Sequence, residues 1–205
     1  MTPDDIARHF TRPDGSYRFA RWGRPIVPVV FGVADESLPV IKGAIEAVVA
    51  CAGHEMSEVD PETGANLMLF FVRDWAELAE VPEMADLVGE VAPLVARLEG
   101  RGATQFRTFR FDGTGAIRAC FAFLRMSEEM AAQPAATLAL GQAAQAMLLW
   151  SDAAFAEASP LALADGVAVL RPDIAAILAA AYDPVLPPAA DDASHALRLF
   201  ARMPR

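Results

Sequence analysis

The chain has 205 residues, a formal net charge of −10 at pH 7 and a hydrophobic fraction of 54%. A chain of this length fits one domain of ordinary size and can bury a substantial core. No five-residue window is rich in Lys or Arg, so the composition argues against nucleic acid and against an anionic membrane surface as partners. No run reaches the ~20 predominantly apolar residues that a membrane-spanning helix needs.

The cysteines and the N-terminal residues bear on the compartment. Cys51 and Cys120 are too few for a disulfide framework, and we expect both to be small apolar core residues. The opening MTPDDIARHF has acids where a secretory signal peptide has a basic region. The sequence as it reads therefore predicts a cytoplasmic location, or a periplasmic one if a leader was removed before residue 1. We expect one domain over residues 1–205, with residues 1–15 as an N-terminal arm.

The first part of the chain predicts extended segments and a helix. Residues 18–33 are expected to be extended, and Pro25 and Pro28 within them suit an edge strand better than a central one. Residues 37–53 have apolar positions at helical spacing and end in glycine, which is typical of a helix C-terminus. Residues 65–72 are apolar without alternation, which indicates a strand covered on both faces.

The remaining segments alternate between helices and a hairpin. Residues 84–98 predict an amphipathic helix that Pro93 kinks or splits. Residues 104–125 predict a β-hairpin around an Asp-Gly turn. Residues 153–170 are expected to be irregular. Two further helices are expected at residues 172–182 and 194–203. The whole pattern indicates one α+β domain.

The segment TLALGQAAQAMLLWSD, residues 137–152, predicts the central helix, at about residues 136–150. It is apolar nearly all round, which is typical of a helix at the centre of a domain. Its polar interruptions, Gln142 and Gln145, are three residues apart and therefore lie on one side. A buried amide left unpaired costs about 1–3 kcal/mol, so a buried pair should have partners. The alternative is that this side of the helix faces water.

This segment has the length and apolar composition of a zinc-peptidase active-site helix but lacks the histidine ligands of the metal. Such a helix carries H-E-x-x-H, whose glutamate activates the metal-bound water. With Gly141 at the first histidine, the glutamate and the second histidine fall on Gln142 and Gln145, and the third ligand of the extended motif falls on Ser151. Glycine has no ligand, an amide is neither a base nor a good zinc ligand, and a hydroxyl alone holds no zinc. We therefore expect no metal, no cofactor and no zinc catalysis.

The end of this segment resembles the signature of an uncharacterised proteobacterial family of unknown function, some of whose members are described as lipoproteins. In that family the stretch runs approximately E-E-x-x-Q-x-L-G-L-x-N-D, a histidine-free relative of the zincin motif. Gln145, Leu149 and Asp152 match the pattern, whereas Gly141 and Gln142 stand in place of its two glutamates.

Further blocks resemble the same family in the same order. Residues 19–22 (FARW) resemble its arginine-tryptophan strand, residues 65–66 (AN) fit the start of the next one, and residues 170–173 (LRPD) and 182–186 (YDPVL) resemble its L-T-x-x-D and L-Y-D-P-x-L stretches. The resemblance implies a zincin-like fold, in which a mixed β-sheet is packed with helices and the helix of residues 137–150 lies below the cleft. It implies no chemistry, because the family has no established activity.

Two functions stay open at this point. The first, which we favour, is a noncatalytic module, either protein- or peptide-binding or structural, on a degenerate zincin-like scaffold. Its peptide groove would remain although the metal site has been lost. The sequence indicates neither the partner nor the oligomeric state. Its ligand cleft would be formed by Gln142, Gln145, Ser151, Asp152 and Tyr182. The second is a metal-independent hydrolase with a rebuilt site in the former cleft, using Asp152, Asp173 or Tyr182.

Several of these residues have a structural alternative. Asp152 would follow a helix C-terminus, where the helix dipole disfavours an acid, so it also suits a cap or a turn. Tyr182 with the Asp-Pro that follows it also suits the packed end of a helix. The acidic turn at residues 55–62 lacks the EF-hand spacing and is expected to be a solvated loop.

Overall fold

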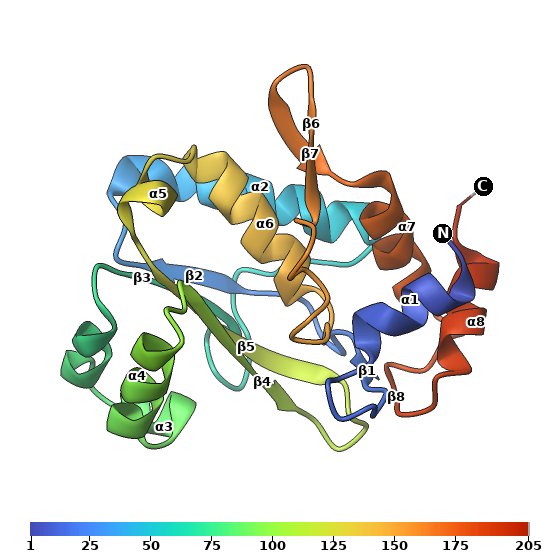
Figure 1. The fold of residues 1–205 in the computed structure, drawn as a ribbon, viewed down its shortest axis with the longest axis horizontal. Coiled ribbons are helices and arrows are strands. Elements are labelled where there is room, and N and C mark those ends of the chain that lie inside the picture. Colours follow the sequence, from blue (N-terminus) through green and yellow to red (C-terminus); the bar gives the residue numbers. More distant parts are fainter. Residues whose placement is uncertain (205) are drawn as a thin grey trace.

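Helices cover both faces of a four-stranded mixed sheet in the computed structural model, which describes residues 1–204 (Figure 1). The helices are α1 (Pro3–Phe10), η1 (Asp35–Ser37), α2 (Leu38–Cys51), η2 (Trp75–Glu80), α3 (Met84–Val88), α4 (Val91–Gly100), α5 (Glu128–Ala131), α6 (Ala135–Ala146), α7 (Pro172–Ala181) and α8 (His195–Arg202). The strands are β1 (Phe19–Ala20), β2 (Pro28–Phe31), β3 (Leu67–Val72), β4 (Gln105–Phe111), β5 (Ile117–Arg125), β6 (Leu161–Ala164), β7 (Val167–Leu170) and β8 (Ala189–Ala190). The α+β class with a mixed sheet packed by helices is confirmed.

The main sheet has the order β2-β3-β5-β4, in which β2, β3 and β5 are parallel and β4 is antiparallel to β5. The expected hairpin at residues 104–125 is the β4–β5 pair. β2 is an edge strand that starts at Pro28, as proline in the sequence predicted. β3 lies inside the sheet and is buried along most of its length, which agrees with its unbroken apolar run.

Alternation along β5 divides the buried side chains between two cores. Cys120, Ala122 and Leu124 belong to a first core that also contains apolar residues of α2, α6 and α7. Phe121 and Phe123 belong to a second core, formed with η2, α3 and α4 on the opposite face. Because successive side chains of a strand point to opposite faces, one apolar strand serves both cores. Of the two cysteines, Cys120 is buried as expected. Cys51, at the end of α2, is exposed, so that expectation was wrong.

Four phenylalanines form a ladder across all four strands on the side of the second core. Phe31, Phe70, Phe123 and Phe106 are successive cross-strand partners. Their ring centroids are 4.7, 4.9 and 6.0 Å apart, and the neighbouring rings are tilted by 14°, 12° and 22°. Offset stacking of this kind contributes about 0.5–1.5 kcal/mol per pair beyond burial. A one-residue slip would turn a strand's side chains to the other face and break the ladder, so the ladder helps to fix the register.

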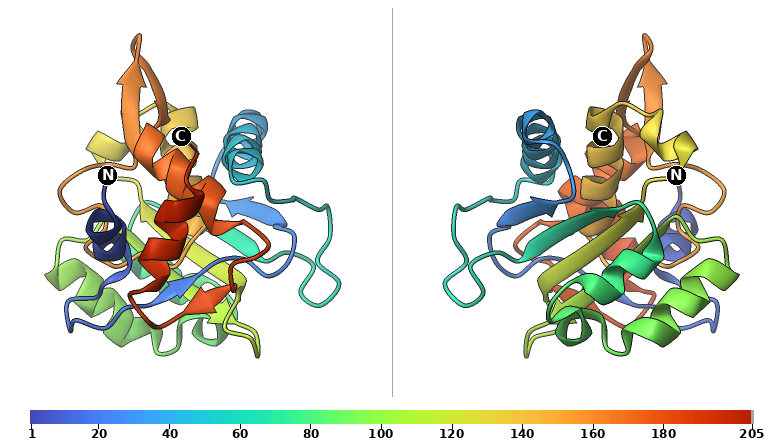
Figure 2. Two further views of the ribbon diagram at one scale, coloured as in Figure 1. Left: turned by 90° about the vertical axis from the view of Figure 1, so that its right-hand side faces the viewer. Right: turned by 90° about the vertical axis from the view of Figure 1, so that its left-hand side faces the viewer.

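Two segments differ from what the sequence predicts. The helix expected at 84–98 is split at Gly89, whose φ is +80°, and Pro93 lies in the first turn of the second piece, where proline is tolerated. The irregular stretch expected at 153–170 contains the β6–β7 hairpin, which projects from the body (Figures 1 and 2). Its turn residues Asp165 and Gly166 both have positive φ, as a two-residue hairpin turn requires.

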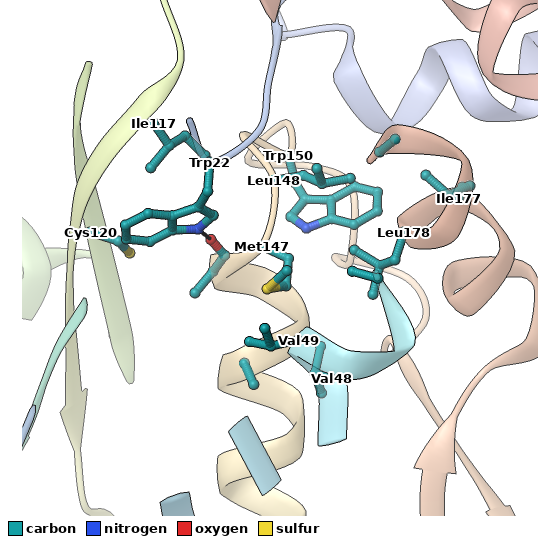
Figure 3. Close-up of a cluster of buried hydrophobic side chains, with 14 of the residues drawn as sticks. Trp22, Val48, Val49, Ile117, Cys120, Met147, Leu148, Trp150, Ile177 and Leu178 are labelled. Carbon is teal, nitrogen blue, oxygen red and sulfur yellow. Dashed lines mark hydrogen bonds between the residues drawn. The ribbon is translucent and has the colours of Figure 1, made fainter. Parts of the chain in front are cut away.

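The central helix α6 ends at Ala146, short of the predicted end near residue 150, because three side chains, two of them from distant segments, occupy the carbonyls at its end. Trp22 donates its indole N–H to the carbonyl of Ala146 at 2.8 Å, and Trp150 donates to Ala144 at 3.0 Å. The hydroxyl of Tyr182 donates to the carbonyl of Met147 at 2.8 Å. Figure 3 shows the two tryptophans at this end of the helix. The orphan carbonyls of the last turn are thus satisfied by side chains.

The segments near the two ends of the chain pack together. β1 pairs with β8, and α1 packs against α8 (Figure 1). The expected N-terminal arm contains α1, whose start is closed by a capping box between Thr2 and Asp5. Among residues 1–204, no helix has the length and apolarity that crossing a membrane requires.

Candidate functional site

A polar pocket of about 480 Å³ lies between α6, the beginning of β4 and the β6–β7 hairpin. Its walls are Thr104, Gln105, Ser127, Glu129, Met130, Gln133, Thr137, Leu138, Gly141, Gln142, Gln145, Ser159, Pro160, Leu161, Ala162, Leu163 and Ala168. Gly141, Gln142 and Gln145, the positions on which the sequence analysis placed the H-E-x-x-H motif, all line this pocket. A Cβ added at Gly141 would meet Leu161 at 3.6 Å, an ordinary contact, so glycine is not sterically required there.

The two glutamines of α6 are held by an arginine on β4. Gln142 is 6% exposed and Gln145 is partly buried. Arg107 donates from Nη2 to Oε1 of Gln142 and from Nη1 to Oε1 of Gln145, the latter at 3.3 Å. Gln142 in turn donates its Nε2 to Oε1 of Gln105 at 2.9 Å. The alternative in which this side of the helix faces water is therefore wrong, because the amides are partners in a network with β4.

Arg107 carries a charge that no acid of the described chain neutralises. Among residues 1–204 it forms no salt bridge, and its Nε is buried without a hydrogen-bond partner. Burial lowers the pKa of its guanidinium from the ordinary value, yet an arginine keeps its proton in proteins. The pocket therefore has a cation beneath its amides. The sequence carried a signal for this contact, since period-two alternation in QFRTFRF places Gln105 and Arg107 on one face of the strand.

The free edge of β4 runs beside the pocket. The N–H of Arg125 donates to the carbonyl of Thr104, which makes that pair hydrogen-bonded across the antiparallel ladder. Hydrogen-bonded and non-hydrogen-bonded pairs alternate along such a ladder. The backbone groups of Gln105, Arg107 and Phe109 therefore point away from β5, to the edge that the order of the sheet leaves open.

The remaining predicted cleft residues do not reach this pocket. Ser151 is buried in a turn, where its N–H donates to the carbonyl of His9 at 2.7 Å and its Oγ accepts from the N–H of Ala153. Asp152, the next residue, is exposed. Tyr182 is buried, and its hydroxyl both donates to the carbonyl of Met147 and accepts from the N–H of Trp22 at 3.4 Å. Burial raises the pKa of this phenol above its ordinary value, so its role here is to close the end of α6.

The residues named for a metal-independent hydrolase are likewise not brought to one cavity. Asp173 lies at the start of α7 and forms a bidentate ion pair with Arg171. Asp152 and Tyr182 lie in the settings described above, and none of the three lines the pocket. A general base needs its carboxylate within reach of the substrate proton, and this arrangement offers none of them to a ligand in the pocket.

Metal-ligating side chains are dispersed over residues 1–204, where no group of three or more His, Cys, Asp or Glu is placed to hold an ion. His54 shares a hydrogen bond of 2.9 Å with the carbonyl of Arg24 and packs on Tyr182. His9 packs on Trp150, and His195 packs on Phe19. Each imidazole thus lies in a different aromatic setting.

The acidic turn is exposed at Glu55, Glu58 and Glu62, as a solvated loop predicts, whereas its fourth acid, Asp60, is buried. Asp60 is 4% exposed and accepts hydrogen bonds from the N–H groups of Glu62 and Thr63 and from the amide of Asn66. Burial raises the pKa of this carboxyl, but these donors outweigh burial and hold the pKa well below its ordinary value. Asn66 also accepts from the N–H of Val27. The carboxylate thus ties the turn to the start of β3, which is a structural role.

Comparison of the chain with protein-family models, with curated proteins and with solved structures finds no match. Residues that carry the resemblance to the proteobacterial family instead have visible structural roles. Trp22 and Tyr182 close the end of α6, and Asn66 donates to the buried Asp60 and so fixes the turn before β3. Those blocks therefore bear on how the central helix and the start of β3 are held.

Proposed function

We propose that the protein is a noncatalytic module that binds an extended peptide segment along the open edge of β4, above the pocket between β4 and α6. The observation that carries this proposal is the coincidence of the two features. The outward backbone groups of Gln105, Arg107 and Phe109 form an edge whose first residue, Gln105, lines a polar pocket. Strand addition uses backbone groups of the edge for affinity and neighbouring pockets for specificity.

The pocket's chemistry suits holding a ligand. Gln105, Gln142 and Gln145 present amides, which donate and accept hydrogen bonds but act neither as bases nor as nucleophiles near neutral pH. Serine and threonine hydroxyls complete the polar walls. A side chain of a bound peptide would find several donors and acceptors here and an aliphatic wall on the β6–β7 hairpin.

We further propose that the scaffold derives from a zincin-like peptidase whose metal motif has been lost. Two features support this proposal. An antiparallel edge strand, β4, faces a central helix, α6, across the pocket. The helix positions at which zincin ligands would stand are Gly141, Gln142 and Gln145, and all three line the same wall. On this proposal the peptide groove persists and the hydrolytic water has no activator.

The test is a selection from a display library of random linear peptides, followed by backbone substitution in the peptides it enriches. N-methylation removes one peptide N–H at a time and leaves the side chains in place. In strand addition only every second N–H faces the edge. We expect N-methylation to abolish binding at alternate positions and to be tolerated at the positions between them, which serve as matched controls. A selection that enriches no peptide, or a tolerance without this alternation, would refute the proposal.

A further inference from the structure

Arg107 is a cation whose side-chain hydrogen bonds go to amide oxygens alone. Its two Nη atoms donate to Oε1 of Gln142 and of Gln145, and its Nε has no partner and no solvent contact. A guanidinium offers five N–H donors and pairs best with a carboxylate, which can take two of them at once. Within residues 1–204 no carboxylate takes that place.

The arginine also fixes which end of each amide is available to a ligand. Because both Oε1 atoms accept from Arg107, both Nε2 atoms point elsewhere. Nε2 of Gln142 donates to Gln105, and Nε2 of Gln145 makes only a long contact of 3.3 Å to the carbonyl of Gly141. An amide whose oxygen is bound to a cation is polarised and becomes a stronger donor through its nitrogen. The wall of the pocket on α6 is therefore rich in donors.

The pocket has few acidic residues although the chain as a whole has a net charge of −10. Among the described residues that line the pocket, Glu129 is the one acid, and its side chain is exposed on α5. The pocket otherwise contains amides, hydroxyls and apolar groups. A group with negative charge would gain most in the part of the pocket near Gln142, Gln145 and the Arg107 guanidinium, away from that acid's exposed position.

We infer that this pocket binds the C-terminal carboxylate of a peptide. The inference rests on the proposed function and deepens it by naming the end of the peptide that is recognised. The pocket lies where β4 begins, at Thr104 and Gln105. A peptide added antiparallel to β4 runs from Phe109 towards Gln105, so its C-terminus arrives at the pocket. The carboxylate then accepts from the glutamine Nε2 groups and supplies the negative charge that Arg107 lacks.

The experiment is an NMR titration of the ¹⁵N-labelled protein with N-acetyl-trialanine as the free acid, with the same peptide as its C-terminal amide, and with acetate. Two sets of signals are followed. The side-chain N–H signals of Arg107 Nε, Gln142 and Gln145 report on the carboxylate. The backbone N–H signals of Gln105, Arg107 and Phe109 report on strand addition.

We expect the acid to move both sets, with an affinity at least tenfold above that of the amide, and acetate to move the side-chain signals alone. Equal effects of acid and amide on the backbone signals would refute carboxylate recognition and leave the proposed function standing. Side-chain shifts with acid and acetate, without backbone shifts, would refute strand addition and support the carboxylate site. Side-chain signals that stay fixed with all three probes would overturn the inference.

A variant separates recognition by Arg107 from a general effect of charge. Gln142→Glu is nearly isosteric and gives the arginine an internal counter-ion, so we expect it to erase the preference for the acid and to raise the melting temperature. Ala136→Glu adds the same charge on the same helix, at an exposed position outside the pocket lining, and should keep the preference. Should Gln142→Glu not fold, Gln145→Glu provides the same test through the second amide. Retention of a tenfold preference in the folded variant would overturn the inference.

Discussion

Replacing His195 by Phe is expected to remove an acid-sensitive part of the free energy of unfolding. The imidazole is 2% exposed, neither ring nitrogen has a hydrogen-bond partner among the described residues, and the ring lies 4.4 Å from that of Phe19. Burial, together with the positive charges of Arg198 and Arg21, lowers the pKa of His195 from 6.5 to about 4. The folded chain therefore keeps this histidine neutral over a range in which the unfolded chain protonates it.

The sign and the size follow from proton linkage. Between pH 6.5 and about 4 the unfolded state binds more protons at this site, so the free energy of unfolding falls as the pH falls. Each unit of pKa difference corresponds to about 1.4 kcal/mol, which gives a total of about 3.5 kcal/mol, of which about 2.5 kcal/mol is lost by roughly pH 4.5. Above the ordinary pKa the contribution of this group to stability is fully present.

The assay is urea unfolding of the wild type and of His195→Phe at neutral pH and near pH 4.5. His9 and His54, whose pKa values burial also lowers, remain in both proteins, so the loss that they cause cancels in the comparison. We expect the wild type to lose about 2.5 kcal/mol more than the variant on acidification. His54→Gln serves as the control at a second histidine and should retain this extra loss. Equal losses in wild type and His195→Phe would refute the reasoning.

Three further predictions concern single contacts. Trp22→Phe leaves the carbonyl of Ala146 without its donor and should lower the free energy of unfolding by about 1–3 kcal/mol in urea denaturation; an unchanged midpoint would show that water replaces the indole. Phe123→Leu interrupts the stack between Phe70 and Phe106 and should lower the free energy of unfolding more than Phe31→Leu, which changes only the end of the ladder. A larger loss in Phe31→Leu would contradict the idea that the four rings act as a unit. Asp60→Asn removes a buried anionic acceptor and should cost about 1–3 kcal/mol at neutral pH. Since the pKa of Asp60 is held below its ordinary value of 3.8, this difference should shrink as the pH falls below that value.

Elements that local pattern specifies were predictable from the sequence. The unbroken apolar run of β3, the Asp-Gly turn between β4 and β5, and Pro28 on an edge each follow from the residues of a single segment. The β6–β7 hairpin could also have been found, because Asp165-Gly166 is a two-residue turn signal. It was missed because both of its strands lack polar alternation, so period two was not visible.

Features that depend on distant partners could not be read in the same way. α6 ends early because Trp22 and Tyr182 reach its last carbonyls, and neither residue is near it in sequence. The partner of Gln142 and Gln145 is Arg107, more than thirty residues away. The spacing of the two glutamines showed only that they lie on one side of the helix, and Arg107 could be assigned to them only once the packing of β4 on α6 was known.

The pairing of β1 with β8 has a consequence for synthesis on the ribosome. A chain made from its N-terminus presents Phe19 and Trp22 long before Ala190 and Ala146, their partners in the sheet and at the end of α6, have been made. Until then Phe19 lacks its strand partner and the indole N–H of Trp22 lacks its acceptor. The parallel strands β2, β3 and β5, by contrast, can associate as soon as β5 has emerged. During synthesis, Phe19 and Trp22 are therefore exposed apolar surface until the segments that bury them have been made.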